Sequence, residues 1–177
     1  MTQQDTGTVE IADGTRTLRL EWEDPSVAVL SLAQLSRDEL VQRLRSGELP
    51  LPPLATVLNI GVVDAEPGHM TLSLTPDERH VNFLGVVGGG VITSVLDVAM
   101  WGAVQLSVDD KSMITTVNMN TSLLRGVSHL QGPLRAVAEA VHVGRTTATA
   151  EARLVDTSDK IYATATATFV RIGGAGA

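Results

Sequence analysis

Three segments in the C-terminal half of the chain place alanine at every second position. Side chains alternate between the two faces of a β-strand, so each segment would carry a stripe of small residues on one face. Three such antiparallel strands side by side would merge these stripes into one surface that a helix can approach closely. The alternating residues are Ala136, Ala138, Ala140, Ala148, Ala150, Ala152, Ala163, Ala165 and Ala167.

Only residues 91–104 are apolar enough to fill the place beside that surface. Their apolar side chains occupy most faces of a helix, a pattern typical of a buried helix. The sequence therefore predicts an α+β protein in which a curved antiparallel sheet wraps around a central helix, which is the hotdog fold. An ordinary α+β sandwich with the helix on one side is the alternative.

Turn residues set the boundaries that we expect for the elements. The N-terminal extension, residues 1–50, would contain a hairpin around Asp13-Gly14 and a helix capped by Ser36 and Glu39. Residues 51–172 would form the main domain, and residues 173–177 a flexible tail. The expected strands are 55–64, 69–75, 113–124, 132–143, 146–156 and 160–171, with a loop over 75–87 and the helix over 89–106.

Composition narrows the classes of function. The net charge of −7 among 177 residues argues against nucleic-acid binding and requires a local basic patch for any anionic ligand. The N-terminus lacks the pattern of a secretory signal, and no segment reads as a membrane span. The chain has no cysteine, which fits a reducing compartment. We therefore expect a cytoplasmic protein.

Asp97 is the only charged residue between positions 81 and 108. A buried carboxylate must be hydrogen-bonded, paired, protonated or open to water. On a helix, Thr93 and Ser94 share its face and could donate to it, but no cation lies within one turn. Such a carboxylate is a candidate general base or nucleophile. The alternative is a structural carboxylate bonded to a neighbouring loop.

A glycine run, Gly88-Gly89-Gly90, leads into this helix. The first amides of a helix have no internal partner and can stabilise a carbonyl oxygen that gains negative charge. The Gly89 and Gly90 amides lie roughly 10–12 Å from Asp97 along the helix axis. If both groups act on one carbonyl, a second subunit must supply one of them, so we expect a dimer. A tight turn with close packing is the alternative explanation of the glycines.

The segment from His80 to Gly90, followed by Leu96-Asp97-Val98-Ala99, resembles the hotdog acyl-CoA thioesterases of the phenylacetic-acid-degradation (PaaI-like) type. Their pattern is Asn-x-x-Gly-x-x-His-Gly-Gly, followed by a helix that carries the acid. The resemblance covers about residues 48–172. It implies hydrolysis of an acyl-CoA to a free acid and coenzyme A, with coenzyme A as part of the substrate and no cofactor or metal. It also implies a homodimer or homotetramer whose sites lie between subunits.

The resemblance also implies a role for each matching residue. Asp97 matches the catalytic carboxylate, and Gly89 matches the glycine whose amide polarises the thioester. Asn82 would orient water or substrate, and Thr116 would position the attacking water. Trp101 could line the acyl pocket, although core packing is the favoured interpretation. The other residues that we expect to contact the substrate or its coenzyme A are Gly88, Gly90, Arg125, Gly144 and Arg145.

Gly88 departs from the pattern because the family has histidine at this position. A side chain that helps to hold the thioester is therefore missing. His80 could replace it, although a surface histidine in a loop is the favoured interpretation. The departure motivates one alternative, a non-hydrolytic acyl-CoA-binding protein. A hotdog hydratase or dehydratase is the second alternative. The missing histidine counts against the second. The sequence encodes no particular acyl group.

Overall fold

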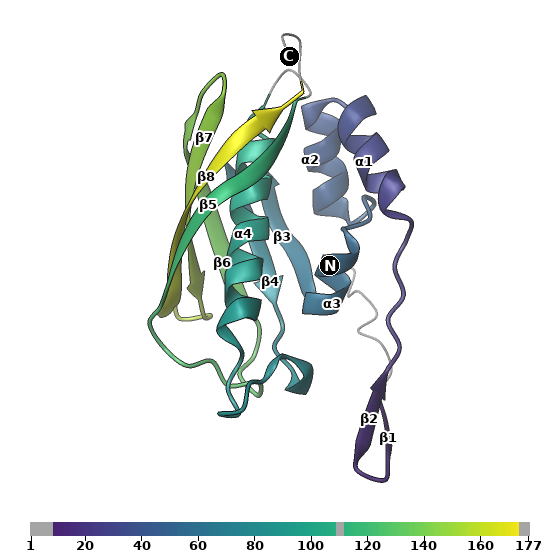
Figure 1. Ribbon diagram of the computed structural model, residues 1–177. Helices are drawn as coiled ribbons and strands as arrows, with labels where there is room; N and C mark the ends of the chain where they lie inside the picture. The colour runs from purple at the N-terminus through teal and green to yellow at the C-terminus, as the bar shows by residue number, and fades with distance from the viewer. Residues whose placement is uncertain (1–8, 109–111, 174–177) are drawn as a thin grey trace.

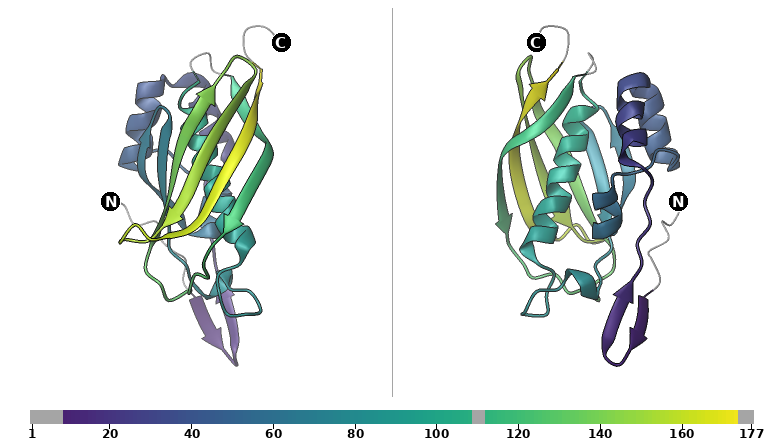
Figure 2. Two further views of the ribbon diagram at one scale, coloured as in Figure 1. Left: turned by 90° about the vertical axis from the view of Figure 1, so that its left-hand side faces the viewer. Right: turned by 45° about the vertical axis from the view of Figure 1, so that its right-hand side comes forward.

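A six-stranded antiparallel sheet curls around one long helix (Figures 1 and 2). The computed structural model describes residues 9–108 and 112–173. The strand order is β3-β4-β6-β7-β8-β5, and β3 and β5 form the two edges. The strands are β3 (Ile60–Glu66), β4 (His69–Leu74), β5 (Met113–Leu123), β6 (Leu134–Val143), β7 (Thr147–Val155) and β8 (Ile161–Ile172). The predicted hotdog arrangement is confirmed.

The alanine stripes form one surface, as predicted. Ala138 pairs with Ala152, which pairs in turn with Ala165, and Ala140, Ala150 and Ala167 form the next row. Helix α4 (Gly89–Gln105) packs on this surface, with Leu96, Ala99 and Ala103 fully buried. Figure 2 shows the helix held in the concave side of the sheet. Since alanine ends at Cβ, the helix can lie close to three strands at once.

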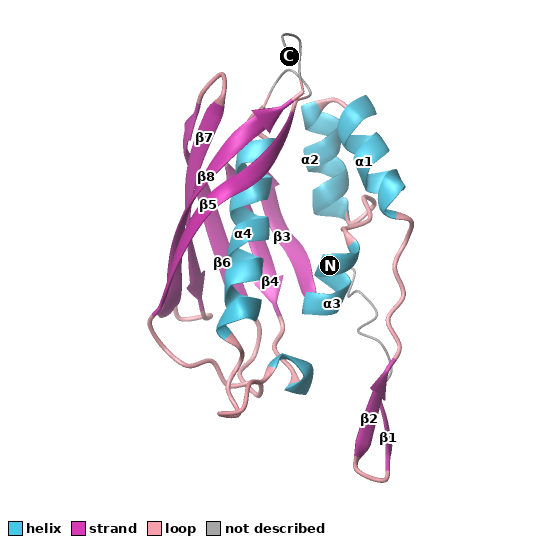
Figure 3. Cartoon of the chain, in the orientation of Figure 1, coloured by secondary structure: helices cyan, strands magenta, loops and turns pink. Residues whose placement is uncertain are grey.

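The N-terminal part is more helical than the sequence indicated. It contains a hairpin of β1 (Val9–Ala12) and β2 (Thr15–Leu18), then α1 (Pro25–Gln34), α2 (Arg37–Ser46) and α3 (Pro53–Leu58) (Figure 3). The hairpin around Asp13-Gly14 and the capping box of Ser36 and Glu39 are both confirmed. The hairpin projects from the body of the molecule (Figure 1), and Arg16 forms an ion pair of 2.6 Å with Glu78.

The strand expected over residues 55–64 is wrong in its first half. Pro53 occupies the first turn of α3, and Asn59 ends this helix with a positive φ of 52°. Proline has the backbone angle of a helix start, and asparagine tolerates the left-handed region, so the segment can form one short helix. Strand β3 therefore begins only at Ile60. Helix α1, which was not predicted, begins after Asp24, whose side chain accepts from the Ser26 amide.

The fold leaves some expectations untested. The domain boundaries at residues 50 and 172 stay predictions, and most of the tail over 173–177 lies outside the described residues. None of the helices within the described ranges is long and apolar enough to cross a membrane.

Candidate active site

Side chains on three successive turns of α4 form hydrogen bonds with the edge strand β5 or the residue before it. We call this row of Asp97, Trp101 and Gln105 the seam of α4. Gln105 donates to the Ser112 carbonyl at 3.0 Å and accepts from the Ile114 amide at 3.1 Å. Trp101 Nε1 donates to the Ile114 carbonyl at 3.1 Å. The hydroxyl of Thr116 donates to Oδ1 of Asp97 at 2.9 Å. Positions four apart on a helix thus meet positions two apart on a strand.

Asp97 is half-buried on this seam. Thr116 is the sole hydrogen-bond donor to its carboxylate among the residues that the structure describes, and none of these residues forms an ion pair with it. Neither Thr93 nor Ser94, the expected donors, binds this carboxylate. The Ser94 hydroxyl donates instead to the Gly90 carbonyl at 2.9 Å. Within the described part of the chain, Oδ2 of Asp97 therefore has no partner, and the partly exposed side chain can contact solvent.

A β-bulge lies directly after Thr116. The register with β8 shifts between Thr116 and Asn118, which makes Val117 the extra residue. Past the bulge, Met119 packs against the core and Leu123 reaches the start of α4. Bulges re-aim side chains and are common beside active sites. Here the bulge lets the strand direct Thr116 toward Asp97 and then present Leu123 to Gly89.

The loop before α4 turns sharply at Gly85, whose φ is 74°. Asn82 Oδ1 accepts from the Leu84 amide at 2.8 Å, so this side chain stabilises the turn. The amide of Gly88 donates to the His80 carbonyl at 2.8 Å, and the carbonyl of Gly88 accepts from the Val91 amide at 3.0 Å.

The next two amides of the glycine run remain available. The amides of Gly89 and Gly90 have no acceptor within the described part of the chain. A Cβ on Gly89 would lie 2.5 Å from Cδ1 of Leu123, so this position has little room for a side chain. The Gly89 amide is therefore an available donor in the described part of the chain. The side chain next to it is Leu123, whose flexible end can move aside.

Gly89 and Asp97 are eight positions apart on one straight helix, about 12 Å along its axis. One thioester carbonyl cannot contact both groups of the same chain over this separation. The two groups could therefore act on one carbonyl only if they came from different copies of the chain, and this expectation stays a prediction.

The remaining predicted contacts lie at both ends of the sheet. Gly89 is beside Leu123, which pairs with Ala163, whereas the turn with Gly144 and Arg145 precedes Thr147, which pairs with Val170. Seven strand residues span about 24 Å, so one chain keeps this turn far from its own Gly89. Arg145 is exposed, and Arg125 donates to the Ile161 carbonyl. A hollow of about 360 Å³ on the outer face of the sheet is lined by Glu139, Glu151 and Arg153 and lies away from Asp97.

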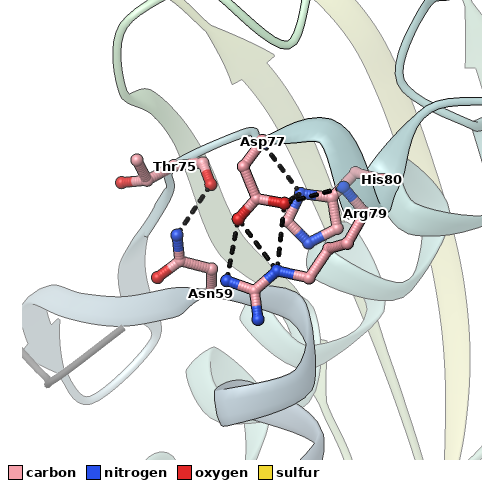
Figure 4. Close-up of polar contacts among 5 residues, drawn as sticks. All are labelled: Asn59, Thr75, Asp77, Arg79 and His80. Carbon is pink, nitrogen blue, oxygen red and sulfur yellow. Dashed lines mark hydrogen bonds and ion pairs between the residues drawn. The ribbon is translucent and has the colours of Figure 1, made fainter. Parts of the chain in front are cut away.

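The interpretation of His80 as a surface histidine is wrong. Its exposed fraction is 5%, and its Nδ1 accepts from the Asp77 amide at 3.1 Å (Figure 4). The ring is enclosed beside α3 and does not replace the missing histidine at position 88. Burial lowers the pKa of His80, while the charge of Asp77 opposes the shift.

Two features of the site were not predicted from the sequence. Gln105 is an uncharged residue at the end of a helix, yet its side chain binds the carbonyl of Ser112, just before β5, and the amide of Ile114 in β5. The Val117 bulge has no local signal other than the loss of strict alternation. No group of three or more histidine, aspartate or glutamate side chains in the described ranges could hold a metal ion.

Comparisons with known proteins place these residues in a family context. Residues 84–163 match the family model of the thioesterase superfamily. A phenylacetic acid degradation-related protein from Ralstonia eutropha JMP134 is 28% identical, with a TM-score of 0.65 over 73% of this chain and 98% of its own. The chain matches no curated protein sequence.

Two more distant structures share the fold. The PaaI protein from the phenylacetic acid degradation operon of E. coli is 21% identical, with a TM-score of 0.67 over 81% of this chain and 98% of its own. A thioesterase from Haemophilus influenzae is 19% identical, with a TM-score of 0.65 over 79% and 92%. The chain therefore has the hotdog fold and matches the thioesterase superfamily over its central region, and its resemblance to the phenylacetic-acid-degradation type is confirmed.

Proposed function

We propose that this protein hydrolyses an acyl-CoA thioester to a free acid and coenzyme A. One observation carries the proposal: within the described residues, helix α4 combines a half-buried carboxylate that has a single hydroxyl partner with amides at its N-terminus that have no acceptor. A carboxylate can activate water or attack a carbonyl, and free amides can stabilise the resulting oxyanion. The match to the thioesterase superfamily supports the same chemistry.

In the proposed reaction, the thioester oxygen accepts from the Gly89 amide. Asp97 of a second copy takes a proton from water as the water oxygen attacks the carbonyl carbon, or its carboxylate attacks directly and water then cleaves the anhydride. The C–S bond breaks, and the thiolate of coenzyme A leaves and takes up a proton. Thr116 orients the Asp97 carboxylate through the bond to Oδ1.

Two further observations support the assembly of two copies. Among the described residues, no side chain of α4 forms a hydrogen bond with β5 beyond Thr116, and the outer edge of β5 has no neighbouring strand. Such an exposed edge can pair with another strand. Phe83, Leu84 and Leu130 are 111%, 85% and 83% exposed on the loops beside the glycine run. We propose that a second copy covers this apolar surface, in a homodimer or a homotetramer.

The position of the β6–β7 turn is consistent with such a dimer. Arg145 lies at the opposite end of the sheet from Gly89 of its own chain, and the partner's turn could supply it to the coenzyme A bound there. Arg125 lies just beyond Leu123, at the Gly89 end of β5. Since arginine suits phosphate geometry, we propose both as contacts for the phosphates of coenzyme A, which is part of the substrate. We propose a reaction without a cofactor, and the proposed location is the cytoplasm.

A non-hydrolytic acyl-CoA-binding protein is the second candidate. The observation that favours it is Gly88, which leaves α4 with no side-chain cap where the family carries histidine. Both functions predict acyl-CoA binding, but only the first predicts release of thiol.

The test is a panel of acyl-CoAs of different chain length and aryl content, with detection of the released thiol. Gly89→Pro removes the amide donor at the first position of α4, where proline is well tolerated. Gly89→Ala is its matched control, since both variants add a Cβ against Leu123 and only proline removes the N–H. We expect Gly89→Pro to lower kcat by about 100-fold relative to Gly89→Ala. Absence of turnover by the wild type on every substrate would contradict hydrolysis.

A further inference from the structure

Asp77, Arg79 and His80 form a polar cluster in the loop that precedes the glycine run (Figure 4). The cluster does not include Asp97 or Gly89. We propose that His80 is a positioning residue for the oxyanion donor, because it holds the loop from which the Gly89 amide emerges. The inference rests on the proposed function, since it assigns a role to His80 in that same site.

The ring of His80 closes a single helical turn, Glu78–His80. Its Nδ1 accepts from the Asp77 amide, and the Asp77 carboxylate accepts in return from the Arg79 amide at 3.0 Å. The Arg79 guanidinium binds the same carboxylate at 2.7 Å. These reciprocal bonds fix the backbone of the turn on both sides of the buried ring.

The backbone of His80 then continues into the site. Its carbonyl accepts from the Gly88 amide at 2.8 Å, and the Gly88 carbonyl accepts from the Val91 amide at 3.0 Å. Gly88 is therefore held at both its nitrogen and its oxygen. A peptide unit is planar, so fixing the Gly88 carbonyl also fixes the opposite direction of the Gly89 N–H. The anchored turn thus determines where the candidate donor points.

Two hydrogen bonds also tie the start of this loop to the residue that ends α3. Asn59, the last residue before β3, donates from Nδ2 to the Thr75 carbonyl at 3.0 Å and accepts from the Thr75 amide at 3.2 Å (Figure 4). The loop that carries His80 begins at Thr75, so α3 and the end of β4 are tied together just before the turn. His80 is packed in the corner that these elements form.

Two substitutions of His80 distinguish the effect of its hydrogen bond to the Asp77 amide from the effect of its packing in the core. His80→Phe retains a ring in the core but has no acceptor for the Asp77 amide. His80→Asn loses volume but places an amide oxygen near the position of Nδ1. Leu154→Val, at a fully buried position of β7 outside the loop, controls for general loss of stability.

The experiment measures steady-state thioester hydrolysis and the amide exchange of Gly88 by NMR in all four proteins. We expect His80→Phe to lower kcat about tenfold, with KM within about twofold, since the donor is misdirected while the substrate contacts remain. His80→Asn should recover most of kcat, and Leu154→Val should keep it. The Gly88 amide should exchange at least about tenfold faster in His80→Phe than in either of the other variants.

Equal kcat and equal Gly88 exchange in His80→Phe and wild type would overturn the inference. So would a loss of kcat in His80→Phe that Leu154→Val matches. If the wild type hydrolyses no thioester, the proposed function fails, and the exchange of Gly88 alone decides whether His80 anchors the loop.

Discussion

The hydroxyl of Thr116 donates a hydrogen bond of 2.9 Å to Oδ1 of Asp97, and so joins the central helix to the edge strand at the proposed reacting group. The bond occupies one carboxylate oxygen and leaves the other free. It also orients Asp97 on the open seam of α4, where a second copy could bring its own glycine amides.

Removing the Thr116 hydroxyl should reduce turnover without unfolding the protein. Thr116→Val should lower kcat by about tenfold, because a hydrogen bond to a charged group contributes about 1.5–3 kcal/mol and water can replace part of it. Thr115→Val is the matched control, since Thr115 is exposed and adjacent in the same strand. Thiol release by both variants at saturating acyl-CoA provides the comparison, and equal rates would show that Thr116 has no role in orienting the carboxylate.

Restoring the family's histidine should be compatible with the fold. Gly88 has a φ of −62° and a ψ of 138°, which any residue can adopt, and an added Cβ would approach no atom closer than 3.6 Å. We expect Gly88→His to keep the free energy of unfolding within about 0.5 kcal/mol of wild type. We further expect kcat/KM for acyl-CoA to rise about tenfold through an added thioester contact. An unchanged kcat/KM would show that the missing side chain does not limit the reaction.

The fastening of α4 to β5 predicts a measurable contribution to stability. Gln105→Ala removes the hydrogen bonds to the Ser112 carbonyl and the Ile114 amide and should lower the free energy of unfolding by about 1–3 kcal/mol. Gln42→Ala, on the exposed side of α2, should change it by less than about 0.5 kcal/mol. Urea denaturation of the two variants tests this, and equal losses would show that the seam contributes nothing.

The buried ring of His80 should make stability depend on pH. Burial lowers the pKa of His80 from its ordinary value of 6.5, so the unfolded chain binds a proton that the folded chain does not. This contribution to stability is present above 6.5 and is lost as the pH falls below that value toward the folded pKa.

Urea denaturation between about pH 8 and about pH 5 measures this effect. His80→Phe should show a flatter decline than wild type, whereas His142→Gln, at an exposed position, should keep the wild-type slope. Parallel curves for His80→Phe and wild type would contradict the assignment.

The core of this fold could be predicted because its residues repeat with the periods of the elements that they form. The alternating alanines predicted the surface that α4 covers. The single charge in α4 identified Asp97 as a candidate catalytic residue. Both are local patterns in which burial and chemistry leave a direct trace in the sequence.

The errors arose from a short helix signal over residues 53–59 and, elsewhere, from tertiary contacts that determine the outcome. Residues 55–58 have strand-forming side chains, but Pro53 and Asn59 close them into α3. His80 follows Asp77-Glu78-Arg79, a polar run that suggests a surface loop, yet its ring is buried and its Nδ1 accepts from the Asp77 amide. Thr116 rather than Thr93 or Ser94 binds Asp97, since only the fold places β5 beside that turn of the helix.

The most direct test of the central claim is complementation between two damaged chains. Asp97→Asn keeps the Gly89 amide, and Gly89→Pro keeps the Asp97 carboxylate, so each should be nearly inactive alone. After subunit exchange at equal concentrations, random assortment gives one intact site in each mixed dimer, or about a quarter of wild-type activity per chain. Activity near that level is the predicted result. Confirmed mixed dimers with no more activity than the separate variants would contradict a site that takes its amide and its carboxylate from different copies.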